Sequence, residues 1–95
     1  MPEIRFEIEW PDGTHETCYS PSLVVKQYLE SEAEYELPDF MERSRAALQE
    51  GSNRVQAKYG FPCGLALGQL QRLEATSAKY VNQDNVKVKL LKFIE

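Results

Sequence analysis

The sequence predicts a single α+β domain, residues 1–95, in which a three-stranded sheet packs against two or three helices. Near both ends of the chain apolar residues alternate with charged ones, and this period of two is typical of half-buried strands. Between these ends the apolar residues recur at intervals of three and four, as they do in amphipathic helices. A chain of this length has room for one hydrophobic core, so one domain is expected.

The first two strands should form a β-hairpin. The first is predicted over residues 3–10, where every second side chain is apolar: Ile4, Phe6, Ile8 and Trp10. The second is predicted over residues 14–19, after the turn sequence Pro11-Asp12-Gly13. Proline fits the first position of a type I turn and glycine fits the left-handed position after it, so the loop should contain three residues.

This loop length fixes the register of the hairpin. It places Glu9 opposite His15, whereas a two-residue loop would place Glu9 opposite Glu16 and bring two like charges together. In the favoured register Cys18 lies opposite Phe6, and its thiol should therefore face the core.

Helices are predicted near residues 21–30, 38–59 and 64–80. Ser20-Pro21 has the pattern of an N-cap followed by proline in the first helical turn. Gly60 fits the left-handed position that ends the long helix, and Pro62 should stop it. The carboxylate-rich segment 30–36 is expected to be a solvated connector. The predicted buried faces contain Phe40, Met41, Ser44, Leu48, Val55 and Tyr59 in the second helix and Ala66, Leu70, Leu73, Ser77 and Tyr80 in the third.

The last strand is predicted over residues 86–94, where Val86, Val88 and Leu90 alternate with Lys87 and Lys89. Its outward lysines complement the outward glutamates of the first strand, so the two strands should be neighbours in the sheet. Parallel and antiparallel pairing both remain open.

Composition excludes several classes of function. Fifteen acidic and eleven basic residues give a net charge of −4, which disfavours binding to nucleic acid. No apolar run is long enough to span a membrane, and the charged N-terminal strand does not match a signal peptide, so a cytoplasmic protein with reduced cysteines is expected. Phosphate loops and dinucleotide-binding glycine motifs are absent from the sequence, and no cofactor is expected.

Cys63 is the candidate for a chemical role. It lies at the start of the third predicted helix, where the helix dipole favours a thiolate, and Cys18 would be the second thiol. The alternative is that Cys63 packs in the core, with Phe61 and Pro62 beside it. A metal site with His15 is not expected, because the spacing fits no zinc pattern and a fourth ligand is missing.

Two further groups of residues are candidates for binding. Arg43, Arg54 and Lys58 fall on one flank of the long helix and could contact a partner protein, or could simply lie over the edge of the core. Four aromatic residues could form a ligand-binding patch, although packing in the core explains them as well: Trp10, Tyr19, Tyr28 and Tyr35.

The chain resembles a small bacterial family of nitrogen-starvation-response proteins encoded in a nitrilase-containing gene cluster. The residues that carry the resemblance are Met1-Pro2-Glu3, Trp10-Pro11-Asp12-Gly13, Cys18 to Val25, Arg43-Ser44-Arg45, Arg54-Val55, Lys58 to Phe61 and Cys63. The resemblance implies a role in scavenging nitrogen from nitriles or cyanide, beside co-encoded enzymes. It assigns no catalytic residue to the chain.

These observations lead to one main hypothesis and two alternatives. The main hypothesis is a non-enzymatic accessory protein that binds a co-encoded enzyme through Arg43, Arg54 and Lys58 together with an exposed sheet edge. The first alternative is a thiol-dependent enzyme or thiol carrier that uses Cys63 and Cys18, and the second is a small-ligand sensor. A homodimer stays open.

Overall fold

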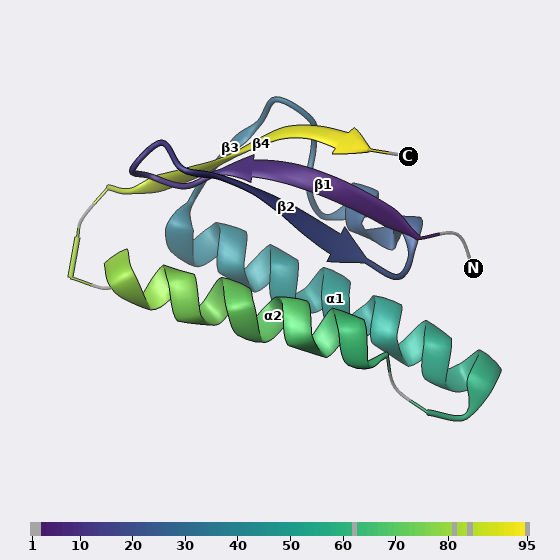
Figure 1. Cartoon of the computed structure of the whole chain (residues 1–95). Helices are drawn as coiled ribbons and strands as arrows, with labels where there is room; N and C mark the ends of the chain where they lie inside the picture. The colour runs from purple at the N-terminus through teal and green to yellow at the C-terminus, as the bar shows by residue number, and fades with distance from the viewer. Residues whose placement is uncertain (1–2, 62, 81, 84, 95) are drawn as a thin grey trace.

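A four-stranded antiparallel sheet forms one layer of the molecule and two helices form the other (Figure 1). The computed structural model describes residues 3–61, 63–80, 82–83 and 85–94. The strands are β1 (Ile4–Glu9), β2 (His15–Ser20), β3 (Glu34–Glu36) and β4 (Lys87–Ile94), in the order β2-β1-β4-β3. The predicted α+β class is confirmed, but within the described residues the sheet has four strands and not three.

The additional strand, β3, lies in the segment that was predicted to be a solvated connector. Its two glutamates pair with lysines of β4, Glu34 with Lys89 and Glu36 with Lys87, while Tyr35 pairs with Val88. Opposite charges directly across an antiparallel pair stabilise it. The alternating carboxylates of this segment therefore belong to a strand, and three residues were too few for the sequence pattern to indicate it.

The predicted register of the hairpin is confirmed. Glu9 pairs with His15 and Phe6 pairs with Cys18, and Cys18 is 1% exposed. Gly13 has a φ of 89°, the left-handed conformation that the three-residue loop requires.

β4 pairs with β1, as predicted, and the pairing is antiparallel. Because the register shifts between Glu7 and Ile8, Lys92 lies opposite Glu7 and Lys89 lies opposite Glu9. Two lysines three residues apart would otherwise point to opposite faces of the strand. The irregularity therefore lets both of them meet a glutamate of β1, and Lys92 Nζ lies 3.8 Å from Glu7 Oε2.

The two long helices are confirmed as α1 (Leu37–Tyr59) and α2 (Gly64–Ser77), which is followed by the short 3₁₀ helix η2 (Ala78–Tyr80). Gly60 ends α1 with a φ of 88°, while Pro62, the predicted stop, lies outside the described residues. The predicted helix over 21–30 is wrong in extent, because only the 3₁₀ helix η1 (Leu23–Gln27) forms there.

The N-cap of this first helix is Ser22 and not Ser20. The Ser22 side chain accepts a hydrogen bond from the Val24 backbone N–H at 3.2 Å. The buried Ser20 hydroxyl instead donates to the Ser22 carbonyl at 2.8 Å, so it fixes the approach of the chain to the helix.

The core lies between the inner face of the sheet and the helices. The inner side chains of β1 and the residue after it are at most 2% exposed: Ile4, Phe6, Ile8 and Trp10. Trp10 packs edge-on against Phe40 of α1 and stacks on Tyr80 of η2, with both ring centroids 6.1 Å away. Its indole N–H donates to Glu16 Oε1 at 2.9 Å, which satisfies its polar end.

The turn between α1 and α2 extends past the ends of the strands (Figure 1). α1 has 23 residues and should span about 35 Å, whereas the six residues of β1 span about 20 Å. The sheet therefore cannot cover the last turns of α1, and the buried residues of this helix end at Ser52. This corrects the prediction for Tyr59, which lies on the expected buried face but is 54% exposed.

Gly51 marks a close contact between α1 and the segment before η1. A Cβ atom at position 51 would lie 3.0 Å from Cγ of Pro21, whereas at Gly68 of α2 the nearest atom is Arg72 Nη1 at 3.9 Å. The rigid proline ring cannot easily move away, so Gly51 is explained by packing.

Two glycine substitutions test this explanation. Gly68→Ala should stabilise the domain by about 0.5–1 kcal/mol, because alanine favours a helix. Gly51→Ala should destabilise it by about 1 kcal/mol, because overpacking outweighs the same helical gain. Urea denaturation of both variants gives the comparison, and equal stabilisation by the two substitutions would show that the Pro21 contact has no energetic weight.

Candidate functional site

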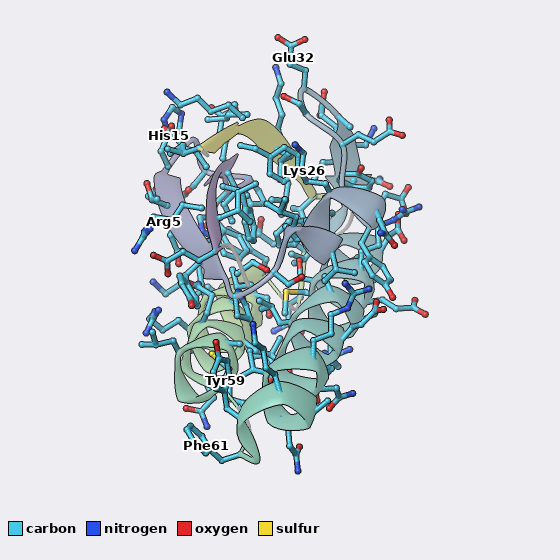
Figure 2. All side chains as sticks on the ribbon, turned by 90° about the vertical axis from the view of Figure 1, so that its right-hand side faces the viewer. Arg5, His15, Lys26, Glu32, Tyr59 and Phe61 are labelled. Carbon is cyan, nitrogen blue, oxygen red and sulfur yellow. The ribbon has the colours of Figure 1, made fainter. Side chains whose placement is uncertain are left out.

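Three large apolar side chains lie exposed at the turn between the two long helices. Tyr59, Phe61 and Leu65 are 54%, 64% and 67% exposed, respectively, and we call this group the helical tip. Figure 2 shows Tyr59 and Phe61 at the end of the molecule that lies away from the sheet. Phe61 was predicted to be in the core. That prediction is wrong, because the turn between α1 and α2 extends beyond the end of the sheet and the sheet cannot cover it.

The chain around the helical tip is positively charged. Between Glu50 and Glu74 the sequence contains no carboxylate but three cations, Arg54, Lys58 and Arg72. The whole chain has a net charge of −4, so the residues outside this segment carry a net charge of −7. The sequence around the tip is thus basic, and Lys58 is the cation that the structure places beside the Tyr59 ring.

Arg43, the first of the predicted partner-binding residues, is held by contacts within the chain. Its Nε donates to both carboxylate oxygens of Asp39 at 3.0 and 3.1 Å, and Nη1 donates to the Tyr28 carbonyl at 3.0 Å. Its guanidinium also lies 4.9 Å from the centroid of the Tyr35 ring. Arg43 therefore ties the segment from η1 to β3 onto α1.

Arg54 and Lys58 lie farther along α1 and closer to the helical tip. Arg54 Nη2 lies 3.3 Å from Glu50 Oε1, and the other oxygen of Glu50 accepts a hydrogen bond from the Tyr28 hydroxyl at 2.7 Å. Lys58 Nζ lies 5.6 Å from the centroid of the Tyr59 ring, so it is part of the surface of the tip. The structure thus separates the three predicted residues, and Lys58 is the one that adjoins the exposed apolar group.

The two cysteines occupy different environments. Cys18 is buried in β2, and burial together with the nearby Glu16 carboxylate raises the pKa of its thiol. A thiol with a raised pKa is a poor nucleophile at neutral pH. Cys63 is half-buried at the N-cap of α2, where its backbone N–H donates to Ser52 Oγ at 3.1 Å.

His15 lies on the face of the sheet opposite to Cys18. Its Nδ1 is 3.4 Å from Glu7 Oε1 and its Nε2 is 3.5 Å from Glu9 Oε1. Among the described residues no three histidine, cysteine or acidic side chains are grouped so that they could hold a metal ion. The structure therefore does not bring His15 and Cys18 together.

The exposed edge of β2 is partly closed by α2. The Tyr19 N–H points away from β1 and donates to Gln69 Oε1 at 3.0 Å, and Arg72 Nη2 donates to the same oxygen at 3.2 Å. Gln69 is 1% exposed, so its side chain is buried against the edge of β2. The edge of β2 is therefore occupied at Tyr19, and β3 forms the other edge of the sheet. Sequence analysis missed Gln69, because a glutamine in an amphipathic helix gives no signal of such a contact.

The four aromatic residues that could have formed a ligand patch are not gathered in one place. Trp10 is 2% exposed in the core, Tyr28 bonds to Glu50, and Tyr35 lies under Arg43. The Arg5 guanidinium lies 5.7 Å from the ring centroid of Tyr19, and Tyr19 also lies near Cys63 at the start of α2. Each ring is used in a separate packing contact.

Comparison with known protein families identifies the chain. Residues 5–93 match the family model described as nitrogen starvation-induced protein NitG. The chain belongs to the NitG family. No curated protein and no solved structure matches it. In the part of the chain that the structure describes, no helix has both the length and the apolar character required to cross a membrane.

The membership connects this fold with nitrogen starvation. The match covers both layers of the domain, from β1 to β4, and includes the helical tip. It confirms the resemblance to a nitrogen-starvation family that the sequence motifs indicated.

The cysteines of this NitG-family protein should differ in reactivity. Under native conditions iodoacetamide should modify half-buried Cys63 first, and Cys18 should react at least about tenfold more slowly because it must wait for local opening. Mass spectrometry of peptides sampled over time measures both rates, and a denatured sample provides the control. Equal native rates would contradict the burial of Cys18.

Tyr19 gives a prediction for alkaline pH. Burial, reinforced by the nearby Cys63 and Glu3, raises the pKa of Tyr19 from 10.0 to about 12. Below pH 10 the phenol is protonated in both the folded and the unfolded chain, so it has no effect on stability there. Between pH 10 and 12 only the unfolded chain loses this proton, and the free energy of unfolding should fall.

Tyr19→Phe should therefore lose less stability than the wild-type protein over that pH range. Denaturation at a series of alkaline pH values measures the difference, with Tyr59→Phe at the exposed tip as the matched control. An unchanged pH dependence in Tyr19→Phe would contradict the raised pKa.

Proposed function

We propose that this protein binds an enzyme during nitrogen starvation and does not itself turn over a substrate. The partner is an enzyme encoded in the same nitrilase-containing gene cluster, which scavenges nitrogen from nitriles or cyanide. The observation that carries the proposal is the helical tip, where Tyr59, Phe61 and Leu65 are each more than half exposed.

Contact of these side chains with water is unfavourable in the isolated domain. A partner that covers them removes them from water, and this favours binding. Grouped apolar side chains in water mark interaction surfaces in proteins of this size. Tyrosine and phenylalanine also gain much contact area when they enter a pocket, and aromatic residues often dominate the energy of interfaces. A projecting tip fits a concave site on the partner.

Charge around the tip supports a protein partner with an acidic surface. Lys58 adjoins Tyr59, and no carboxylate occurs in the sequence between Glu50 and Glu74. Such a surface should increase the rate of encounter with an acidic partner, and this attraction should weaken as salt is added.

The placement of Cys18 and His15 argues against a catalytic pair formed by these two residues. General acid–base and nucleophilic catalysis both need two groups within reach of each other. Cys18 faces the core with a raised pKa, whereas His15 lies on the outer face between Glu7 and Glu9.

Affinity capture tests the proposal. The tagged protein, expressed in nitrogen-starved cells, should retain an enzyme of the gene cluster, and the variant Phe61→Ser/Leu65→Ser should lose it. Calorimetry with that purified enzyme should show affinity at least about tenfold weaker for the double variant, because two buried apolar contacts are lost. Lys58→Glu should weaken binding less, and mainly at low salt.

The control is Leu23→Ser, which removes another exposed apolar side chain, 38% exposed, from a different part of the surface. It should leave capture unchanged. Equal capture by the wild-type protein and the tip variant would exclude the tip as the binding surface. Substrate turnover by the isolated protein, abolished by Cys63→Ser, would overturn the proposal in favour of the thiol-dependent enzyme.

A further inference from the structure

A polar pocket lies at one end of the sheet, beside the turn of the β1–β2 hairpin. It has a volume of about 540 Å³, and its lining includes Pro11 and Gly13 of the turn together with Asn85, Val86 and Lys87. Figure 1 shows the hairpin turn at the end of the molecule opposite to the turn between α1 and α2. This pocket, which we call the sheet-end pocket, is therefore separate from the helical tip.

The sheet-end pocket lies where the hydrogen-bond ladder between β1 and β4 stops. The last pair of this ladder is Glu9 with Lys89, but β4 begins two residues earlier, at Lys87. If the register continued, Pro11 would lie opposite Lys87, and Pro11 belongs to the turn instead. Lys87 therefore has Glu36 of β3 opposite it on one side and, among the described residues, no strand residue on the other.

The backbone N–H and C=O of Lys87 both point toward this unpaired side. The Val86 carbonyl accepts a hydrogen bond from the Leu37 N–H at 3.0 Å on the side of β3, so the Lys87 N–H of the same peptide group points the other way. The Lys87 carbonyl also points away from β3, because the Val88 N–H of its peptide group faces Tyr35. Within the part of the chain that the structure describes, neither group has a hydrogen-bond partner.

Charge alone does not select a ligand for the sheet-end pocket. The charged residues in its described lining are two glutamates and two lysines, Glu9, Glu34, Lys87 and Lys89. Lys89 lies between the two glutamates in the sheet. These charges balance within the chain, so a ligand that carried an excess charge of either sign would gain little. A ligand that fits must be neutral overall and must satisfy the two backbone groups of Lys87.

We propose that the sheet-end pocket binds a free α-amino acid, whose main-chain groups complete the ladder opposite Lys87. The ligand carboxylate accepts a hydrogen bond from the Lys87 N–H, and the ligand ammonium group donates one to the Lys87 carbonyl, as a residue of β1 would. The Lys87 carbonyl lies on the side of Lys89, whose partner across the ladder is Glu9, so the ammonium group has a carboxylate on its side of the pocket. The Lys87 N–H lies on the side of Asn85, where the side-chain amide can donate to the carboxylate.

The geometry favours a ligand with a free amino group. In a longer peptide, the residue before the bound one would need the ladder position opposite Val88, and Trp10 occupies that position. The site thus accepts either a free amino acid or the first residue of a peptide. The free amino acid fits better, because its carboxylate cancels the charge of its ammonium group. The volume of the pocket is within the range that is usual for small-molecule sites.

Nuclear magnetic resonance of the isotope-labelled, purified protein tests this site without any protein partner. L-Alanine is the probe, because the proposed contacts involve only main-chain groups of the ligand. It should bind with a dissociation constant on the order of 1 mM, as expected for a few polar contacts to a small ligand. The largest change in amide chemical shift should be that of Lys87. The absence of any change at Lys87 would overturn the proposal.

Two analogues of alanine test which groups are recognised. L-Alaninamide lacks the carboxylate and propionate lacks the ammonium group, so each should bind at least about tenfold more weakly than L-alanine. Equal binding of L-alaninamide would indicate capture of a peptide N-terminus, and equal binding of propionate would indicate a general anion site on the lysines. Either result would overturn the proposal.

A pair of substitutions at Lys87 separates its backbone from its side chain. Lys87→Pro removes the N–H and should abolish binding, and proline is tolerated at the first residue of a strand where the N–H is unpaired. Lys87→Met keeps the N–H and should weaken binding only about threefold, because an exposed ammonium group contributes little. Lys92→Met, elsewhere on β4, is the matched control and should bind as the wild-type protein does.

Circular dichroism shows whether each variant is folded. Equal binding by Lys87→Pro and Lys87→Met would contradict the backbone contact. If Lys87→Pro does not fold, the Lys87 amide signal and the two analogues still decide the question in the wild-type protein. The inference does not depend on the proposed function, because all of these measurements use the isolated protein and leave the helical tip unchanged.

Discussion

The four apolar side chains on the inner face of β1 and at its end, Ile4, Phe6, Ile8 and Trp10, determine how the rest of the molecule is arranged. β1 is paired on both sides, with β2 through a tight hairpin and with β4 from the other end of the chain. Its inner face can be removed from water only if both long helices cross beneath it. Trp10 is an example of this packing, because its ring contacts Phe40 of α1 and Tyr80 of η2.

The outer face of the sheet is organised by charge. Glu7 and Glu9 of β1 lie between His15 of β2 on one side and lysines of β4 on the other. Exposed pairs of this kind contribute little to stability individually, but they favour one register over its neighbours. The shift in the register of β4 preserves these pairs where strict alternation would have broken them. The same preference for opposite charges places β3 against β4.

The helical tip follows from a difference in length between the two layers. A helix of 23 residues extends beyond strands of six to eight residues, and the excess has no sheet to pack against. The last turns of α1, which lie beyond the sheet, could have carried only polar side chains. Here they lead to Tyr59, Phe61 and Leu65 and contain no carboxylate. The apolar tip is therefore the part of the two-layer fold that the sheet does not cover.

Local pattern in the sequence determined the hairpin register, the two long helices and the position of β4 beside β1. Residues close in sequence were enough to predict the turn, as with Pro11 and Gly13. Pairing of opposite charges was enough to predict that β4 lies beside β1. Tertiary structure alone decided β3, because three residues are stabilised by their partner strand and not by their own pattern. It also decided the candidate site. Tyr59 and Phe61 have the sequence signature of a core, and only the length of the sheet beneath them leaves them exposed. The same holds for Gln69 and Arg43, whose partners, Tyr19 and Tyr28, are brought near them by folding.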